Sequence, residues 1–397
     1  MTTLLVLLVL VLLSVAIWQM TKIFDLTRVG KNSDASQIAN DNDNNVQGYL
    51  MFGFLIFLYV FIIGGLLKWG HLVLGTPASE HGPEYDNLMY ISFAIIFFVL
   101  ALTQLLLHYF AFKYRGEQGR KALYYADNDK LEFIWTIIPV IVLAGLILYG
   151  LYTWTNIMFV DEDEDVMVVE LYAKQFNWEA RYSGKDNVLG KANVRLIEGV
   201  NTTGTDLEDP NAQDDFTSSE LHLPKGKKIV FKLRSQDVLH SAYMPHFRAQ
   251  MNCVPGMVTQ FAFRPTMTTD EMRQDEGIIQ KVETINKIRS KKSAALVADG
   301  KSPLDPYAFD YLLLCNKICG PSHYNMQMKI VVDTPEDFQK WLKDKKTIAQ
   351  AVKEDKASKE AEKNPAPVAP AAPAAAKVDV KVDSTKTVEA AKTQVKK

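Results

Sequence analysis

Cys315-Asn-Lys-Ile-Cys-Gly-Pro-Ser-His-Tyr-Asn-Met326 brings two thiols, an imidazole and a thioether into twelve residues. Sulfur together with imidazole is the ligand set that copper prefers, whereas calcium and magnesium prefer oxygen ligands. Zinc ribbons and iron–sulfur sites usually contain more cysteines, arranged in Cys-x-x-Cys pairs. The chain of 397 residues has only 3 cysteines, so the stretch predicts a site for a soft metal ion, with copper favoured.

The residues around this stretch predict a loop between two strands. Gly320 and Pro321 interrupt any helix that the four-residue spacing of the ligands would otherwise suggest. Tyr311–Leu314 has the composition of a strand, and Met326–Val332 alternates between apolar and polar residues at its start. Two strands would therefore hold a ligand loop at one end of a β domain.

Two other interpretations of the loop stay open from these residues alone. Cys315 and Cys319 could form a disulfide, which is sterically possible outside the cytoplasm but gives no role to the nearby His and Met. A single-copper blue site needs one Cys and would leave the second thiol unused. Two thiolates suit a site in which both sulfurs bridge two metal ions, and a copper site also needs an imidazole from elsewhere in the chain.

The chain has 7 histidines, and His240 is the best candidate for the additional imidazole. It ends the segment Ser235-Gln-Asp-Val-Leu-His240, which follows the strand-like run Lys228–Leu233. We expect it at a strand end, where it can meet a neighbouring loop. His246 is the second candidate, while the other histidines lie in a membrane-proximal loop, at the end of an apolar segment or before a turn.

With these residues in view, the sequence resembles subunit II of the haem–copper cytochrome oxidases, a family that carries a binuclear copper centre called CuA. The resemblance covers roughly residues 88–345 and keeps the order of the family's motifs. Those motifs are Asp237-Val-Leu-His240-Ser, Val254-Pro-Gly256, Cys315-x3-Cys319-Gly-x2-His323-x2-Met326 and Leu131-Glu-Phe-Ile-Trp-Thr-Ile-Ile-Pro139.

The resemblance implies a copper centre and an electron path. A cytochrome c-type donor outside the membrane would give electrons to the two copper ions. These would pass them to the haems and copper of subunit I in a proton-pumping oxidase, where oxygen is reduced to water. Subunits I and III are the expected partners, and the chain alone should reduce no oxygen. The implied copper ligands are His240, Cys315, Cys319, His323, Met326 and the backbone carbonyl of Lys317.

Four apolar segments of 17–22 residues precede the copper loop: Leu4–Met20, Tyr49–Leu67, Leu88–Leu107 and Phe133–Trp154. Each is long enough to cross a hydrocarbon core of ~30 Å. We therefore predict four transmembrane helices, in units at 1–48, 49–87 and 88–154, the last being a hairpin like that of the family. Basic residues follow the first segment rather than precede it, which favours a retained helix over a cleaved signal peptide.

Basic residues in the connecting loops predict the orientation of these helices. Lys22, Arg28 and Lys31 follow the first segment, and four basic residues lie within 113–121, whereas 68–87 contains one Lys and several acidic residues. Loops rich in Lys and Arg stay in the cytoplasm. The copper domain and the C-terminus are therefore expected on the outer (periplasmic) side of a bacterial inner membrane.

Residues 155–350 are predicted to form this extramembrane domain. Strand-like runs separated by turn signals suit a Greek-key β barrel or sandwich, and the resembled family has a cupredoxin fold. Surface insertions are expected near 201–217 and 268–306, the second with a helix-like run at 278–295. The strand candidates are Val166–Tyr172, Phe176–Tyr182, Lys228–Leu233, Val258–Phe263, Tyr311–Leu314 and Met328–Val332.

The C-terminal part is predicted to leave the folded domain. A short helix should begin after Thr334, because Thr caps helices and Pro follows it at the first helical position. Residues 351–397 are rich in Lys, Glu, Ala and Pro and are predicted to form a disordered tail. The formal net charge of −2 argues against a polyanionic partner, so no nucleic acid is expected.

The resemblance implies roles for three further residues. Phe176 and Trp178 stand at the family's aromatic positions for accepting electrons from the donor, with Phe176 replacing the Trp that is usually exposed. Glu132 stands where the family has a Glu at the mouth of a proton path into subunit I. Taken without the resemblance, Glu132 is an acidic residue that favours a helix N-terminus.

Several positions depart from the family pattern. Lys317 replaces a Glu that usually reaches a magnesium ion at the subunit I interface, and Asn252 replaces a common Asp, which puts the magnesium site in doubt. Arg181 stands where an acid often helps to dock a basic cytochrome, while Asp237 and the acidic run Asp161–Asp165 remain. We therefore expect a membrane-bound or complex-attached c-type cytochrome that relies less on electrostatic steering.

Other functions fit the sequence less well. A quinol oxidase subunit II lacks the copper ligands, and nitrous-oxide reductase needs a His-rich catalytic domain. A membrane-anchored copper-insertion or thiol redox protein can use Cys-x3-Cys with a distant His, but a thioredoxin-like αβ pattern would be expected around it. The third cysteine, Cys253, is interpreted as a small core residue.

Overall fold

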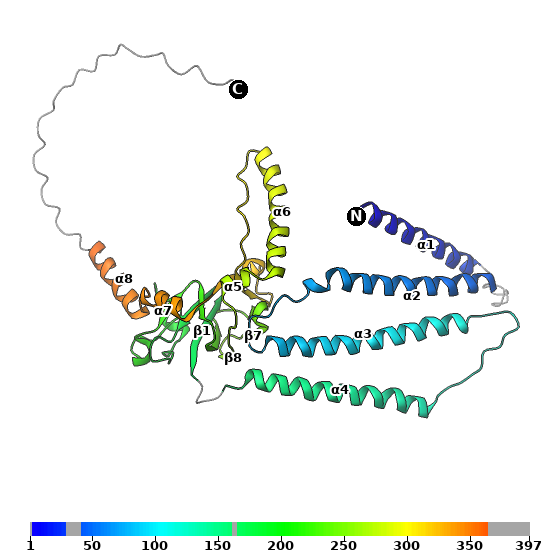
Figure 1. The fold of residues 1–397 in the computed structure, drawn as a ribbon, viewed down its shortest axis with the longest axis horizontal. Helices are drawn as coiled ribbons and strands as arrows, with labels where there is room; N and C mark the ends of the chain where they lie inside the picture. Colours follow the sequence, from blue (N-terminus) through cyan, green and yellow to red (C-terminus); the bar gives the residue numbers. More distant parts are fainter. Residues whose placement is uncertain (1, 29–40, 161–164, 364–397) are drawn as a thin grey trace, which may run out of the picture.

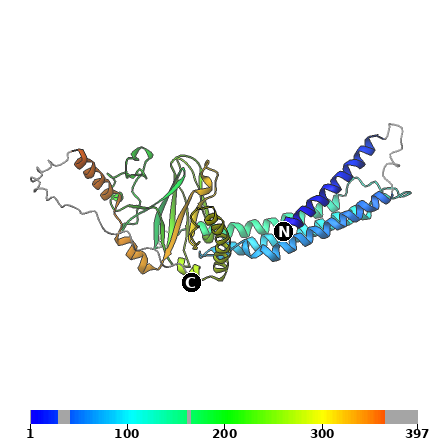
Figure 2. The same ribbon diagram turned by 90° about the horizontal axis from the view of Figure 1, so that it is seen from above.

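The computed structural model describes residues 2–28, 41–160 and 165–363. Three long helices run side by side and lead to a β domain at one end of the group (Figure 1, Figure 2). They are α2 (Asp41–Trp69), α3 (Gly82–Lys113) and α4 (Asp129–Met158). Each is long and apolar enough to cross a membrane, so the β domain lies just beyond one end of a membrane-spanning group.

The prediction of four membrane spans is corrected to three among the described residues. The first apolar segment does form a helix, α1 (Thr2–Arg28). Among the side chains that the structure describes, its apolar stretch is Val6–Thr21, so α1 does not count among the spanning helices. The other three predicted segments lie within α2, α3 and α4.

The β domain is a sandwich of two five-stranded sheets with the orders β3-β2-β1-β5-β8 and β4-β10-β9-β6-β7. The pairs β1–β5 and β4–β10 are parallel and the other pairs are antiparallel. This architecture confirms the cupredoxin-like β domain that the sequence predicts. The strands are β1 (Val166–Lys174), β2 (Asn177–Tyr182), β3 (Phe216–Ser218), β4 (Leu221–Pro224), β5 (Lys228–Ser235), β6 (His240–Met244), β7 (Ala249–Cys253), β8 (Thr259–Phe263), β9 (Tyr311–Cys315) and β10 (Gln327–Asp333).

The buried faces explain which strands the sequence reveals. In β5, Ile229, Phe231 and Leu233 alternate along the strand and are fully buried in the core, which is the pattern expected of a strand with one face against a core. In β6 the polar His240 and Ser241 are buried beside apolar neighbours, so the alternation is lost. For this reason β6 is absent from the predicted strands. The short strands β3 and β4 are also absent, as is β7.

The segment between α2 and α3 attaches the sandwich to the membrane helices. The N–H of Ala78 donates to the carbonyl of His246 at 2.7 Å. Arg248 donates to both carboxylate oxygens of Asp86 in α3, at 2.7 and 2.9 Å. These contacts fix the β6–β7 end of the sandwich beside the ends of the helices.

Two helices, α5 (Thr269–Arg273) and α6 (Glu276–Ala298), are inserted between β8 and β9. The predicted helical run 278–295 lies within α6, whose N-cap Asp275 accepts a hydrogen bond from the N–H of Ile278. The 201–217 insertion consists mainly of turns. Short 3-10 helices are η2 (Gly70–Leu72), η3 (Val194–Leu196), η4 (Pro210–Ala212), η5 (Pro245–Phe247) and η6 (His323–Asn325).

The C-terminal region contains more helix than the sequence predicts. Helix α7 (Pro335–Lys343) begins at Thr334 as expected, with the Thr334 hydroxyl accepting from an N–H in the first turn. The predicted tail is corrected, because α8 (Ile348–Lys363) occupies its first part. Its Ala, Lys and Glu residues are good helix formers, and Ile348 is buried. Residues 364–397 of the predicted tail, residues 161–164 of the acidic run and Lys31 lie outside the described residues.

Candidate metal centre

Strands hold the cysteine loop at both of its ends. Cys315 ends β9 and Met326 directly precedes β10, and the N–H of Cys315 donates to the Met326 carbonyl at 3.0 Å. The N–H of Asn316 donates to the carbonyl of Ser241 in β6 at 3.0 Å. His240 begins β6, which corrects the expectation that it lies at the end of a strand. The loop and His240 therefore meet at the same end of the sandwich.

Two imidazole–thiol pairs face each other at this end. The sulfurs of Cys315 and Cys319 are 3.9 Å apart. Nδ1 of His240 lies 3.8 Å from the sulfur of Cys315, and Nδ1 of His323 lies 3.6 Å from the sulfur of Cys319. His240 is fully buried. The structure thus brings together the four side chains that the sequence analysis singled out for strong metal ligation.

The two weaker predicted ligands complete the same cluster. The sulfur of Met326 is 3.8 Å from the sulfur of Cys319, and the carbonyl oxygen of Lys317 is 3.2 Å from the sulfur of Cys315. All three cysteines of the chain are free thiols, and the 3.9 Å between the loop sulfurs is far longer than a disulfide bond of about 2.05 Å. The disulfide interpretation is therefore not supported.

This ligand set fits a pair of soft metal ions. Metal–sulfur bonds are about 2.3 Å long, so two sulfurs 3.9 Å apart can both bind one ion and can bridge two. Each sulfur also has one imidazole beside it. Thiolate, imidazole and thioether together favour copper.

Burial controls the protonation of the Cys319 thiol. It raises the pKa of this thiol to about 11, and the adjacent Cys315 adds to the increase. The Cys319 thiol of the metal-free chain therefore keeps its proton at neutral pH. Metal binding must release this proton, because the thiolate is the ligand.

Asp237 orients the buried imidazole. Its Oδ1 lies 2.9 Å from Nε2 of His240, and its Oδ2 accepts from the N–H of Gln175 at 2.7 Å. Burial acts to raise the pKa of Asp237, but the hydrogen bonds from Gln175 and His240 outweigh it and hold the pKa below its usual value. The charged carboxylate thus keeps the proton on Nε2 and leaves the lone pair of Nδ1 facing the sulfurs.

We expect Asp237→Asn to weaken metal retention about tenfold, in the range typical of such supporting contacts. Loss of the negative charge should also raise the reduction potential of the centre, because the more positive oxidised state loses a favourable interaction. Chelator competition and a redox titration measure the two effects. Asp270→Asn is the matched control, since Asp270 is exposed on α5; equal effects from both substitutions would contradict the role of Asp237.

The two aromatic residues lie beside the cluster at different depths. Trp178 is only 1% exposed, and its ring meets the His240 ring edge-on with 6.2 Å between centroids. Phe176 is partly buried and packs closely on the loop, since a Cβ on Gly320 would lie 2.9 Å from its ring. Phe176 is therefore nearer to the surface, and Trp178 is nearer to the ligand.

The site residues predicted from the sequence do not include two exposed residues of the loop. Ile318 and Tyr324 are 87% and 88% exposed, and they flank Cys319 and His323 in the chain. An apolar residue between ligands in a hydrophilic loop is the sequence signal that could have identified them. Both are exposed apolar side chains on the surface of the loop that carries the candidate ligands.

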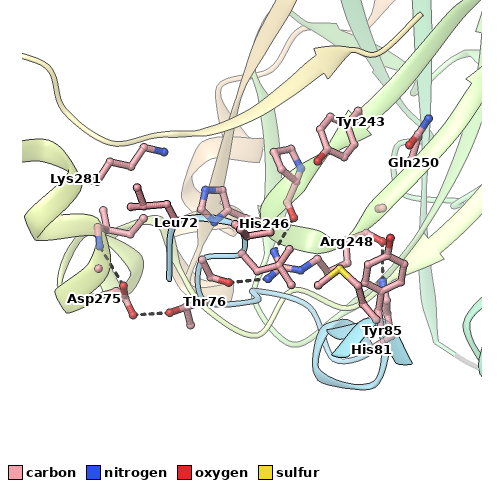
Figure 3. Close-up of a pocket in the computed structure, with 18 of the residues that line it drawn as sticks. Leu72, Thr76, His81, Tyr85, Tyr243, His246, Arg248, Gln250, Asp275 and Lys281 are labelled. Atoms are coloured by element: carbon pink, nitrogen blue, oxygen red, sulfur yellow. Dashed lines mark hydrogen bonds between the residues drawn. The ribbon is translucent and has the colours of Figure 1, made fainter. Parts of the chain in front are cut away.

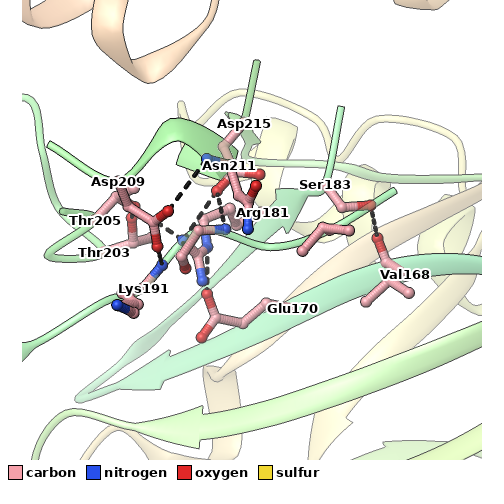
Figure 4. A network of polar contacts seen from close by, with 12 residues as sticks. Val168, Glu170, Arg181, Ser183, Lys191, Thr203, Thr205, Asp209, Asn211 and Asp215 are labelled. Atoms are coloured by element: carbon pink, nitrogen blue, oxygen red, sulfur yellow. Dashed lines mark hydrogen bonds and ion pairs between the residues drawn. The ribbon is translucent and has the colours of Figure 1, made fainter. Parts of the chain in front are cut away.

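Arg181 does not lie on this surface, which corrects its comparison with a docking residue. Its side chain is 3% exposed and donates to Oε2 of Glu170 at 2.5 Å and to Oδ2 of Asp215 at 3.1 Å (Figure 4). It also donates to the carbonyl of Gly190 and the hydroxyl of Thr205. Arg181 is thus a buried structural residue.

Glu132 lies far from the metal centre. It is in the first turn of α4, after the N-cap Asn128, and this end of α4 is the one away from the β domain (Figure 1). Its position on the opposite side of the membrane group agrees with the orientation expected from the loop charges.

Comparison with known proteins shows which family the chain is similar to. A family model for the transmembrane domain of cytochrome c oxidase subunit II matches residues 75–153, and one for its periplasmic domain matches residues 167–271. An alternative cytochrome c oxidase subunit 2 from Bradyrhizobium diazoefficiens is 33% identical over 276 residues, covering 69% of this chain and 84% of the relative. The chain belongs to the cytochrome c oxidase subunit II family.

More distant members of the family also match. A cytochrome c oxidase subunit 2 from Thermostichus vulcanus is 24% identical over 307 residues, with 71% of this chain and 81% of the relative covered. A crystal structure of the periplasmic domain of subunit II of cytochrome oxidase from Bradyrhizobium japonicum aligns at 15% identity with a TM-score of 0.27, covering 47% of this chain and 95% of that chain.

Membership of the subunit II family makes the chain a subunit of a haem–copper oxidase, anchored in a membrane and carrying a domain on its outer side. The family carries CuA, and the cluster of His240, Cys315 and Cys319 is a matching site for copper. The periplasmic-domain match ends at residue 271, before α6, so it includes His240 but not the cysteine loop. The alternative of a copper-insertion or thiol redox protein is not favoured, because the loop leads into β10 of a sandwich.

Proposed function

We propose that the six convergent groups hold the binuclear CuA centre of this oxidase. The observation that carries the assignment is the pair of imidazole–thiol contacts across a sulfur separation of 3.9 Å. When bound, the copper pair would supply a store for one electron at a time. The proposed ligands are His240, Cys315, Cys319, His323, Met326 and the backbone carbonyl of Lys317.

The protein contributes to electron transfer by holding these ligands in fixed positions. The hydrogen bond between Cys315 and Met326 closes the loop, and the one between Asn316 and Ser241 ties it to β6. Asp237 fixes the ring of His240. Ligands held in this way move little when an electron arrives or leaves, which lowers the barrier to transfer.

The proposed electron path runs from a c-type cytochrome outside the membrane to the centre and on to the haems and copper of subunit I, where oxygen is reduced to water. Phe176 would receive the electron near the surface, and Trp178 would couple it to His240, because Trp178 meets the His240 ring and is buried. Subunit III would be a further partner in a proton-pumping complex of a bacterial inner membrane.

Glu132 is proposed to lie at the mouth of a proton path on the cytoplasmic side. Its place in the first turn of α4, at the end away from the β domain (Figure 1), supports this side. The side chain of Lys317 is exposed and brings a cation where the family has a carboxylate. We therefore infer that any magnesium at the subunit I interface lacks a ligand from this position.

The donor is proposed to be a membrane-bound or complex-attached c-type cytochrome that docks on apolar surface. Ile318 and Tyr324 are exposed on the loop that carries the proposed ligands, while Lys317 beside Ile318 in the chain is a cation that repels basic proteins. A soluble basic cytochrome relies on acidic residues for steering, and this loop offers none.

Rapid mixing of the assembled oxidase with reduced soluble basic cytochrome c tests this proposal. We expect electron acceptance to change by less than about threefold between low and physiological salt, because steering that raises association rates by 10–10³ is absent. Ile318→Glu should slow acceptance from the native membrane-bound donor, whereas Ile279→Glu, at an exposed position on α6, should not. If electron transfer from the basic cytochrome is fast and its rate falls steeply as the salt concentration rises, the donor proposal is contradicted. The copper assignment would not be affected by that result.

A further inference from the structure

Helix α6 runs across the membrane helices rather than along them. In both views it is perpendicular to the long axes of α2, α3 and α4 and lies level with their ends next to the β domain (Figure 1, Figure 2). In Figure 1 it extends past α2, on the side away from α4. A helix in this position lies parallel to the membrane plane at the height of the outer headgroups.

A cavity of about 970 Å³ lies between α6, the helix ends and the sandwich, and it shows which face of α6 is turned to the helix ends. Its walls include Leu72 from η2, His246 from η5 and Lys281 from α6 (Figure 3). Trp154 from α4 and Thr284 from α6 also line it. Residues spaced three or four apart share a helix face. The face of Lys281 and Thr284 therefore continues along α6 through Ile288.

This face is basic around an apolar centre. Ile288 is 62% exposed. From residue 284 to its end, α6 has four basic residues, Lys287, Arg289, Lys291 and Lys292, and no acidic one. Arg289 is occupied by the carbonyl of Asp305, whereas the lysines have no carboxylate partner among the described residues. Apolar residues flanked by Lys are typical of helices that lie in a membrane interface.

The cavity also places an imidazole and a carboxylate beside Lys281. Nδ1 of His246 is buried without a hydrogen-bond partner among the described residues. Burial lowers the pKa of His246 to about 4, and the Lys281 cation contributes to the decrease. The one carboxylate on this wall, Asp275, is already engaged by the Thr76 hydroxyl at 2.7 Å and by the N–H of Ile278.

We propose that α6 lies on the outer leaflet and that its face formed by Lys281, Ile288, Lys291 and Lys292 binds the headgroups of anionic phospholipids. The phosphate groups would meet the lysines, and Ile288 would sit among the upper parts of the acyl chains. Positive charge next to the ends of membrane helices is the arrangement that attracts anionic lipid. The site is independent of the metal centre.

A nitroxide spin label on Ile288→Cys in the assembled, copper-loaded oxidase tests the proposal, with unmodified oxidase as the labelling blank. Collision of the label with an aqueous nickel chelate is measured in nanodiscs of phosphatidylcholine alone, in nanodiscs that also contain phosphatidylglycerol, and in detergent. Val297→Cys is the matched control, because residue 297 is nine positions further on and lies on the opposite face of α6, where it is 56% exposed.

We expect the label at 288 to lose at least half of its nickel accessibility when phosphatidylglycerol is present, and to regain it when Lys281, Lys291 and Lys292 are changed to Gln. The label at 297 should remain accessible throughout. Equal accessibility at 288 in both lipids would overturn the proposal. Protection that persists in detergent would also overturn it and would assign this face to a protein partner. An unchanged visible spectrum in every variant shows that the copper domain is intact.

Discussion

Cys319→Ser should abolish the binuclear centre and lower electron acceptance by more than about 100-fold, since changes to supporting residues alone cost 10–100-fold. The sulfur of Cys319 is the junction of the cluster, with Cys315, His323 and Met326 all within 3.6–3.9 Å of it. A serine hydroxyl is a hard, weak ligand for copper. Copper analysis, visible spectroscopy and oxidase turnover measure the loss.

Cys253→Ala is the matched control for this substitution. Cys253 is a buried thiol in β7, paired in register with His240, and burial raises its pKa to about 12. Its sulfur is not part of the ligand cluster found among the described residues, so copper content and turnover should be kept. Normal copper content and turnover in Cys319→Ser, or an equal loss in Cys253→Ala, would contradict the ligand assignment.

Arg181→Met should destabilise the β domain by about 3–5 kcal/mol, the usual cost of removing one partner from a buried ion pair. Glu170 and Asp215 would both lose their contact with the guanidinium, and both are almost fully buried (Figure 4). Glu170 would keep its ion pair with Arg234, but Asp215 forms no ion pair with a second cation among the described residues. Thermal unfolding of the full chain should shift down by roughly 10 °C.

The loss should depend on pH in a defined direction. Burial raises the pKa of Asp215 to about 6, and Arg181 opposes the increase. Removing Arg181 raises this pKa further. A carboxyl with a higher pKa in the folded than in the unfolded state favours folding as the pH falls. The difference in stability between Arg181→Met and the unchanged chain should therefore be larger at pH 8 than at pH 5.

Arg273→Met provides the comparison for an exposed ion pair. Arg273 pairs with Asp270 and Asp310 on the surface and is 41% exposed, so its loss should cost no more than about 1 kcal/mol. A similar shift for both substitutions, or a larger loss for Arg181→Met at low pH, would contradict the account of the buried network.

Local sequence predicts the metal loop and its setting well. The spacing from Cys315 to Met326, with Gly320 and Pro321 inside it and strand patterns on both sides, identifies a clamped ligand loop, and the structure has that loop between β9 and β10. The long apolar helices follow from composition alone. These features depend on neighbours in the chain, which is why the sequence reveals them.

Features that depend on distant partners are harder to predict. Arg181 looks like a surface residue until Glu170 and Asp215 are seen to surround it. His240 begins a strand that has no alternation, because both faces of β6 are buried. The exposure of Ile318 and Tyr324 can be recognised only when the position of the loop is known. The face of α6 that is proposed to meet the membrane can be recognised only when the positions of the helix ends are known.

Electron paramagnetic resonance of the oxidised, copper-loaded full chain distinguishes a binuclear copper centre from a mononuclear one. Two copper ions held by Cys315 and Cys319 would share one unpaired electron, and coupling to two equivalent nuclei of spin 3/2 would give seven lines. We expect this seven-line signal together with a purple visible spectrum. A four-line signal, which one copper nucleus produces, would contradict the proposed centre.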